Sequence, residues 1–215
     1  MIFDSLAEAF SGAIFLTLGI PIGIIPHMDN KTIILSRALE AFAARGYDGV
    51  GVQEIAAAAG VTKPTLYHYF GSKQGLLTAL MDIYLEPFNQ QVAAAAEYRG
   101  DLPATLTALA RVYFSYAKEQ PVFYRMLLAM SYAPHNSEAR LVSATQQSQQ
   151  YHLVEAVFFS AARDHGNMRG RHQLFAANFI GLMNTSISLW LNGSVKLDDT
   201  LLQQVVRQFQ YGIYS

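Results

Sequence analysis

Apolar residues recur every three or four positions along most of the chain from residue 31 onward, which is the spacing of one helix face. Glycine, proline and asparagine interrupt this periodicity and divide the chain into predicted helices. The sequence shows no strand-like alternation and no internal repeat, so we predict an all-α fold. The predicted helices cover 31–45, 52 up to Gly60, 63–70, 73–98, 103–119, 121–132, 136 or 137 to 164, 170–191, and 198 or 199 to 211.

Two short predicted helices are joined by Gly60-Val61-Thr62. Gly60 has no Cβ and can take the left-handed conformation that ends a helix. Thr62 is a good N-cap, and because Pro64 has no N–H, the natural donor to the Thr62 hydroxyl is the N–H of Thr65. Two helices joined by such a turn form a helix-turn-helix, whose second helix enters the major groove of DNA.

The residues around this turn resemble the signature of the TetR (tetracycline-repressor-like) family of bacterial transcriptional regulators. The resemblance covers about residues 31–77 and rests on Ile55-Ala56, Ala-Gly-Val-Thr at 59–62, Thr-Leu-Tyr-His-Tyr-Phe at 65–70, Ser72-Lys73, and the segment 41–47. It implies an N-terminal three-helix DNA-binding domain at 28–75. A C-terminal helical bundle at 76–215 would then bind an effector and dimerise.

The resemblance also implies which side chains face DNA. These are Gln53, Thr62, Lys63, Pro64, Thr65, Tyr67, His68, Tyr69 and Lys73. Physical chemistry supports Lys73, because the first turn of a helix favours a phosphate. Gly51 stands where the family usually has threonine, and Pro64 where it usually has a small residue. We therefore expect the groove-binding mode but not inherited base preferences.

The C-terminal part carries aromatic and methionine side chains at helical spacing. Such a stripe is most often core, but as a set these residues fit a bundle with an apolar cavity for a small hydrophobic effector. The candidate effector-binding residues are Phe88, Tyr113, Phe114, Phe123, Met126, Met130, Tyr151, Glu155, Asn178, Phe179 and Met183. Arg125 and Asn184 are further polar candidates. Glu155 would favour a cation and Arg125 a carboxylate, unless either is simply exposed or ion-paired.

Small residues on one side of the penultimate predicted helix permit close approach of another helix. The resemblance implies that the last two helices pair with their symmetry mates in a homodimer, as palindromic double-stranded DNA operators require. The candidate interface residues are Leu174, Ala177, Gly181, Ser188, Leu202, Val205 and Phe209.

Composition narrows the remaining chemistry. The 215 residues include no cysteine, which excludes disulfides and thiolate sites, and the net charge of −1 argues against a whole-molecule polyanion binder. Between residues 29 and 75 five basic residues oppose four acidic ones, so the placement of charge must provide the phosphate contacts. We find no His–Glu pair on one helix turn and no catalytic motif, and therefore expect no metal, no cofactor and no enzyme.

Residues 1–27 differ from the rest. The apolar run Ala13–Ile25 is shorter than the roughly 20 residues of a membrane span and is interrupted by glycine and proline, and no basic start marks a signal peptide. We prefer an upstream mis-start or an extension added in cloning. The alternative is a genuine helix over roughly Phe3–Leu16.

Together these features predict a cytoplasmic, homodimeric transcriptional regulator with no membrane partner. We expect a repressor that leaves its operator when an effector enters the bundle and shifts the helix after the headpiece, bending it at Pro87. An activator or a corepressor-dependent form stays open. The alternatives from other classes are an all-α small-molecule-binding dimer that has lost operator binding, suggested by Gly51 and the thin positive charge, and an α-helical enzyme. Lost DNA binding would identify the first, and turnover of a bound ligand the second.

Overall fold

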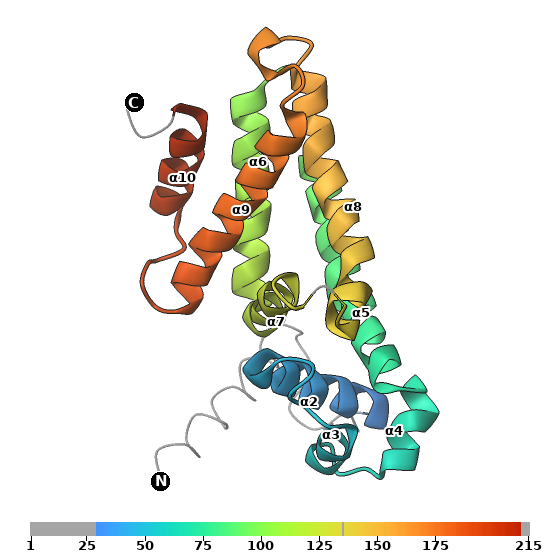
Figure 1. The fold of residues 1–215 in the computed structure, drawn as a ribbon. Coiled ribbons are helices and arrows are strands. Elements are labelled where there is room, and N and C mark those ends of the chain that lie inside the picture. Colours follow the sequence, from blue (N-terminus) through green and yellow to red (C-terminus); the bar gives the residue numbers. More distant parts are fainter. Residues whose placement is uncertain (1–28, 135, 212–215) are drawn as a thin grey trace, which may run out of the picture.

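The computed structural model describes residues 29–134 and 136–211 (Figure 1). Over these residues it has helices and no strand, which confirms the all-α prediction. The predicted extension at 1–27 lies outside the described residues. The helices are α2 (Asn30–Arg45), α3 (Val52–Ala58), α4 (Lys63–Phe70), α5 (Lys73–Ala95), α6 (Leu102–Glu119), α7 (Pro121–Ser131), α8 (Glu138–Ala161), the 3₁₀ helix η1 (Gly166–Met168), α9 (His172–Leu191) and α10 (Asp199–Tyr211).

Local capping sets the helix ends of the headpiece, which consists of α2, α3 and α4. The Asp29 carboxylate accepts from the Thr32 N–H at 2.8 Å and begins α2, and Gly46 ends α2 with φ 75°. At the end of α3, the Val61 N–H donates to the Ala56 carbonyl at 3.0 Å, and Gly60 has φ 67°. This is the Schellman arrangement that a glycine favours. The predicted turn chemistry at Gly60 is confirmed.

Helix α4 begins and ends at the predicted residues. The Thr65 N–H donates to Thr62 Oγ1 at 3.3 Å, the predicted cap, and Gly71 ends the helix. Ser72 then begins α5 by accepting from the Gly75 N–H at 2.9 Å. Thr62 and Ser72 cap two successive helices and stand only ten residues apart. Local hydrogen bonds therefore set both ends of the short helix α4.

Helix α5 joins the headpiece to the C-terminal body and runs through the exposed Pro87 without a break. The helical spacing of Leu76, Leu80, Ile83 and Tyr84 predicts one inward stripe. Ile83 is 47% exposed, so the prediction is wrong for this residue. The buried face rotates along the helix. Leu76 and Leu80 face the core near the headpiece, whereas Leu85, Phe88 and Val92 form the buried face further along, where α6 and α8 pack. Ile83 falls on the side that neither partner covers.

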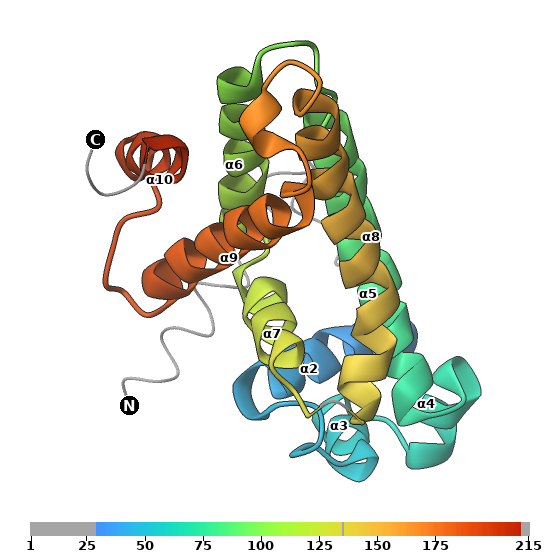
Figure 2. The same cartoon turned by 45° about the horizontal axis from the view of Figure 1, so that its top comes forward.

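The body places α5 alongside α8 and α8 alongside α9, with α6 next to α5 and α10 on the outer side of α6 (Figures 1 and 2). An aromatic cluster centred on Phe88 fills its middle. The Phe88 ring stacks on Tyr116 at 4.1 Å and meets Tyr113 edge-on at 5.1 Å. Helix α7 packs on α2 and thereby connects the body to the headpiece a second time.

Candidate DNA-binding and effector sites

The recognition helix α4 is anchored through one side and free on the other. Leu66 is fully buried and Phe70 is half-buried, and their spacing of four residues places both on one side of the helix. Tyr67 and Tyr69 are 39% and 41% exposed. The remaining predicted DNA contacts are also placed outward: Gln53, Thr62, Lys63, Pro64 and His68 are exposed, and Thr65 and Lys73 are half-buried.

Interactions on the outer face of α4 order its side chains before DNA arrives. The hydroxyls of Thr62 and Thr65 share a hydrogen bond of 2.8 Å, and the Lys63 ammonium lies 5.4 Å from the centre of the Tyr67 ring. A cation over an aromatic face is weakly attracted and keeps its charge. Lys63 and Tyr67 therefore present one combined donor surface.

Lys73 is less free than the sequence suggested. Its ammonium lies 4.1 Å from the centre of the Tyr47 ring and 6.0 Å from that of Phe42. Desolvation lowers the pKa of Lys73, while Asp48 and Glu138 act in the opposite direction. The candidate phosphate contact at Lys73 thus lies beside the junction of headpiece and body.

Two of the headpiece cations are already paired. Arg37 forms an ion pair with Glu40 at 2.9 Å, and Arg45 forms one with Glu54. Lys63 has no carboxylate within ion-pair distance in the described part of the chain. The recognition helix therefore presents a lysine whose charge is available to phosphate.

The predicted effector residues divide into buried, exposed and cavity-lining side chains, and Glu155 forms ion pairs with two histidines. Most are core: Phe88, Tyr113, Phe114, Phe123, Met126, Met130, Phe179 and Met183 are buried. Asn178 is exposed, and Arg125 is an exposed residue that donates to the Leu191 carbonyl at 3.1 Å. Only Tyr151 of the candidate set lines the interior cavity described next, together with the further candidate Asn184.

A cavity of about 320 Å³ lies between α7, α8 and α9. Its wall combines aliphatic side chains with amide, hydroxyl and guanidinium groups. The lining residues are Leu127, Leu128, Ser131, Arg140, Ala144, Gln147, Ser148, Gln150, Tyr151, Ile180 and Asn184. Sequence reasoning missed Arg140 and Gln147, because α8 is polar along much of its length and its periodicity does not distinguish a cavity wall from a solvated face.

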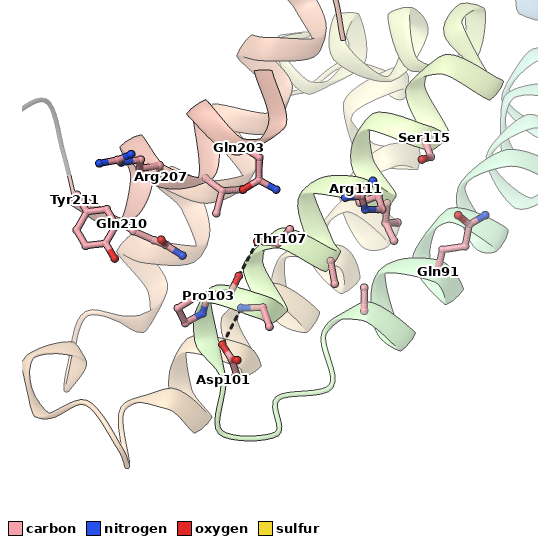
Figure 3. A pocket seen from close by; sticks show the side chains of 15 residues that line it. Gln91, Asp101, Pro103, Thr107, Arg111, Ser115, Gln203, Arg207, Gln210 and Tyr211 are labelled. Atoms are coloured by element: carbon pink, nitrogen blue, oxygen red, sulfur yellow. Dashed lines mark hydrogen bonds between the residues drawn. The ribbon is translucent and has the colours of Figure 1, made fainter. Parts of the chain in front are cut away.

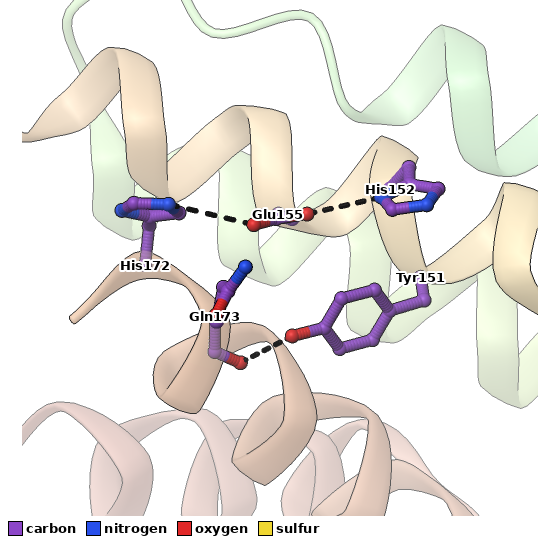
Figure 4. A network of polar contacts seen from close by, with 5 residues as sticks. All are labelled: Tyr151, His152, Glu155, His172 and Gln173. Atoms are coloured by element: carbon purple, nitrogen blue, oxygen red, sulfur yellow. Dashed lines mark hydrogen bonds and ion pairs between the residues drawn. The ribbon is translucent and has the colours of Figure 1, made fainter. Parts of the chain in front are cut away.

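Glu155 lies at the contact of α8 with α9 (Figure 4). Its carboxylate meets His152 Nδ1 at 3.0 Å and His172 Nε2 at 3.4 Å, and next to it the Tyr151 hydroxyl donates to the Gln173 carbonyl at 2.8 Å. The expectation that no His–Glu pair shares a helix turn is wrong, because residues three apart on a helix are neighbours. No group of three or more metal-ligating side chains occurs within 29–134 and 136–211.

A groove of about 1140 Å³ runs between α6 and α10 and reaches α5 (Figure 3). Its floor is small and apolar at Ala104, Ala108 and Val112, and Arg111 and Arg207 are among its polar residues. Arg111 pairs with Asp199 at 2.9 Å. None of the predicted effector residues lines this groove.

The predicted dimer residues divide between the outer face of α9 and the packed side of α10. On α9, Leu174 and Ala177 are exposed and Gly181 and Ser188 are half-buried. On α10, Leu202 and Val205 are 2% and 5% exposed, and Phe209 packs edge-on against Phe179 at 5.3 Å. These three α10 side chains are thus occupied by packing inside the protomer.

Comparison with known proteins supports the motif. The family model "Bacterial regulatory proteins, tetR family" matches residues 34–80. The HTH-type transcriptional activator FasR of Mycolicibacterium smegmatis is 27% identical over 87% of this chain and 84% of its own length. Residues 34–80 therefore carry a DNA-binding segment of the TetR type.

Solved regulator structures share the fold over most of the chain. FadR of Bacillus subtilis, in complex with stearoyl-CoA, has a TM-score of 0.69 at 19% identity, covering 84% of this chain and 98% of its own. AibR, in complex with isovaleryl coenzyme A and operator DNA, has a TM-score of 0.62 at 24% identity, covering 83% and 95%. Body and headpiece alike therefore have the same fold as these two proteins.

Gly51 offers a test of the missing family threonine. It caps α3 without a side-chain hydrogen bond, has φ −90° and ψ 146°, and leaves open space where a Cβ would stand. We predict that Gly51→Thr stabilises the protein by about 0.5–1 kcal/mol, chiefly by restricting the unfolded chain. Urea unfolding measures this, and the same variant should bind duplex DNA more tightly through the added hydroxyl.

Gly60→Thr is the matched control, because its Cβ also meets open space but its φ of 67° disfavours any side chain. This variant should lose about 1–2 kcal/mol of unfolding free energy. A Gly51→Thr protein that unfolds at lower urea than the wild type would contradict the prediction.

Proposed function

We propose that this protein is a homodimeric, DNA-binding transcriptional repressor of the TetR family whose operator binding responds to a small apolar effector. The observation that carries the proposal is α4, which is capped at both ends, anchored by Leu66, and presents Lys63, Tyr67 and Tyr69 outward. A helix held in this way can enter a major groove without reordering. Two copies in a dimer would stand one DNA turn, about 34–36 Å, apart.

The effector class is supported by relatives. FadR is described with stearoyl-CoA and AibR with isovaleryl coenzyme A, both acyl compounds. FasR is named an activator, so the position of the operator relative to the promoter, and not the fold, is expected to decide the direction of control. We retain repression as the proposal. From the similarity to transcriptional regulators we also infer a cytoplasmic protein without enzymatic activity.

Operator binding is tested by fluorescence anisotropy on DNA from upstream of the protein's own gene, against a scrambled duplex, at two salt concentrations. We predict a margin of at least about 10³ over the scramble. Lys63→Ala should weaken binding and reduce the salt dependence by about one ion per protomer. Arg37→Ala removes an equal charge that is already paired with Glu40, and should have the smaller effect.

Weak, salt-sensitive and equal binding to both duplexes would contradict the prediction for that DNA. Selection from genomic fragments then separates a distant operator from a headpiece that has lost operator binding. Recovery of no fragment would favour the small-molecule-binding dimer. A reporter gene downstream of a recovered fragment distinguishes repression from activation.

Dimerisation through α9 is supported by an unusual surface. By length and composition α9 alone among the described helices is apolar enough to cross a membrane, yet only 28% of its most apolar window is buried in the protomer. The outward side is lined by Leu174, Ala177, Gly181 and Thr185. Small and hydroxyl-bearing residues suit close packing against another helix better than contact with acyl chains. A second α9 is therefore the proposed partner.

Gly181 tests this interface. A glycine inside a helix costs about 1 kcal/mol relative to alanine, and here open space surrounds the missing Cβ. We predict that Gly181→Leu folds as a protomer but shifts sedimentation from dimer to monomer, because the new side chain separates the two helices. Ala93→Leu adds the same side chain to the exposed face of α5 and should remain dimeric. A dimeric Gly181→Leu would place the interface elsewhere.

A route from the body to the headpiece is supported by one hydrogen bond. The Tyr47 hydroxyl, in the headpiece, donates at 2.6 Å to Glu138, the first residue of α8, and Tyr47 is only 5% exposed. Desolvation and this bond both raise the pKa of Tyr47, so the phenol stays protonated and donating at neutral pH. Movement of the start of α8 would therefore be transmitted to the α2–α3 connection.

Tyr47→Phe should loosen the headpiece without changing the body. We predict a loss of about 1–2 kcal/mol, as for a hydrogen bond to a partly exposed carboxylate, with faster hydrogen exchange confined to α2–α4. Tyr98→Phe removes the same kind of bond, from the Tyr98 hydroxyl to Asp164 at 2.8 Å, at the far end of the body. Its headpiece exchange should equal that of the wild type. Equal protection of α2–α4 in both variants would refute the coupling.

A further inference from the structure

The cavity between α7, α8 and α9 has a specific polar character. Leu127, Leu128 and Ile180 make one part of its wall apolar, whereas Arg140 and Gln147 supply hydrogen-bond donors. No aspartate or glutamate is among the lining residues that the structure describes. A site of this composition attracts an acceptor or an anion and disfavours a cation.

Gln147 contains a buried donor without a partner. Its Oε1 accepts from Ser131 Oγ at 3.3 Å, but its Nε2 is buried and no acceptor within 29–134 and 136–211 reaches it. Buried amide groups are nearly always hydrogen-bonded, since an unmet donor costs free energy. A ligand that brings an acceptor into the cavity accounts for this group.

Two more donors converge on the same cavity. The Arg140 guanidinium is half-buried and uses NH1 to donate to the Ser131 carbonyl, which fixes the fork and leaves its other N–H groups for another acceptor. Asn184 Oδ1 accepts from the Tyr124 hydroxyl at 2.8 Å, so the NH₂ group of that amide remains a donor. Three side chains from two helices thus offer N–H groups to one small space.

We propose that this cavity binds the polar head of the effector, and that the effector is a short acyl compound with a carboxylate or an acyl carbonyl. The volume of about 320 Å³ lies at the lower end of the roughly 300–1,000 Å³ of small-molecule pockets, which favours a short ligand. The apolar body of the ligand contacts Leu127, Leu128 and Ile180. This inference rests on the proposed function, because it defines the ligand of the same regulator.

The position of the cavity connects it to the headpiece. Arg140 lies two residues after Glu138, whose carboxylate accepts from Tyr47. The first turns of α8 therefore carry both a ligand donor and the anchor of the headpiece. A ligand that draws Arg140 into the cavity acts directly on the residue pair that joins the two parts.

Isothermal calorimetry on the DNA-free dimer tests the site with four probes: benzoate, isovalerate, benzamide and isovaleryl-CoA. Saturable binding of an acid, at least tenfold tighter than benzamide, supports recognition of a free carboxylate. Saturable binding of isovaleryl-CoA with no response to either acid supports an acyl carbonyl whose carrier lies outside the cavity. Failure of every probe to saturate one site per protomer overturns the proposal.

Gln147→Met removes the unpartnered donor while keeping the length of the side chain. We expect the bound probe to lose about three- to tenfold in affinity and the melting temperature of the free protein to stay equal or rise. Gln149→Met, two residues further along α8 and exposed, should change neither quantity. A lower melting temperature with unchanged affinity would show that the amide is satisfied within the protein, and overturns the assignment.

Arg140→Gln is a second, independent variant. If the wild-type protein binds benzoate, this variant should lower the preference for benzoate over benzamide at least tenfold. If the wild-type protein binds only the thioester, the variant should weaken the binding of isovaleryl-CoA. In both cases the free protein should remain folded. Unchanged preference and affinity would remove Arg140 from the site. Because these measurements use no DNA, their failure is separate from that of operator binding: specific operator binding without any probe binding leaves the regulator in place and overturns only the ligand site.

Discussion

The continuity of one apolar core along α5 is the constraint on which the remaining structure depends. Leu76 and Leu80 pack with the headpiece, and Leu85, Phe88 and Val92 pack with the body, so a single helix is buried in both parts. A helix buried at both ends cannot shift at one end without disturbing packing at the other, because close-packed interiors transmit displacement. Regulation in such a molecule has to act by moving α5 or the helices that share its core.

The second connection, through α7 and the start of α8, determines where such movement can begin. Helix α7 packs on α2, and Glu138 accepts from Tyr47, so the headpiece is held from two sides. The interior cavity lies between these elements and α9. A ligand there would contact the helices that hold the headpiece and the helix proposed to hold the partner subunit, which places effector, DNA and dimer contacts within one connected set of helices.

The surface of the headpiece shows how a nearly neutral protein can approach DNA. Arg37 and Arg45 are neutralised by Glu40 and Glu54, and Asp29 serves as a helix cap. Lys63 remains unpaired in the described part of the chain and stands over Tyr67. The net charge of the whole chain therefore says little about its partner, because local pairing decides which charges a phosphate meets.

Local chemistry determined the helices. Gly60, Thr62, Pro64, Gly71 and Ser72 set the ends of α3, α4 and α5 from interactions within a few residues, and these can be read directly in the sequence. The outward face of α4 followed as well, since the spacing of Leu66 and Phe70 defines its buried side. The packing of one helix on another cannot be read from the sequence in this way.

Tertiary structure alone decided the interior. Glu155 was a candidate for the effector cavity, but it pairs with two histidines instead. His152 stands one turn before it on α8, which the spacing along that helix already determines. His172 is brought to it only by the packing of α9 on α8. Leu202 and Val205 have the pattern of an interface and are core, because an apolar stripe does not state which neighbour covers it. Arg140 and Gln147 line one cavity only because α7, α8 and α9 meet there. The periodicity of apolar residues indicates that one face of a helix is buried, but only the fold determines which neighbouring element covers that face.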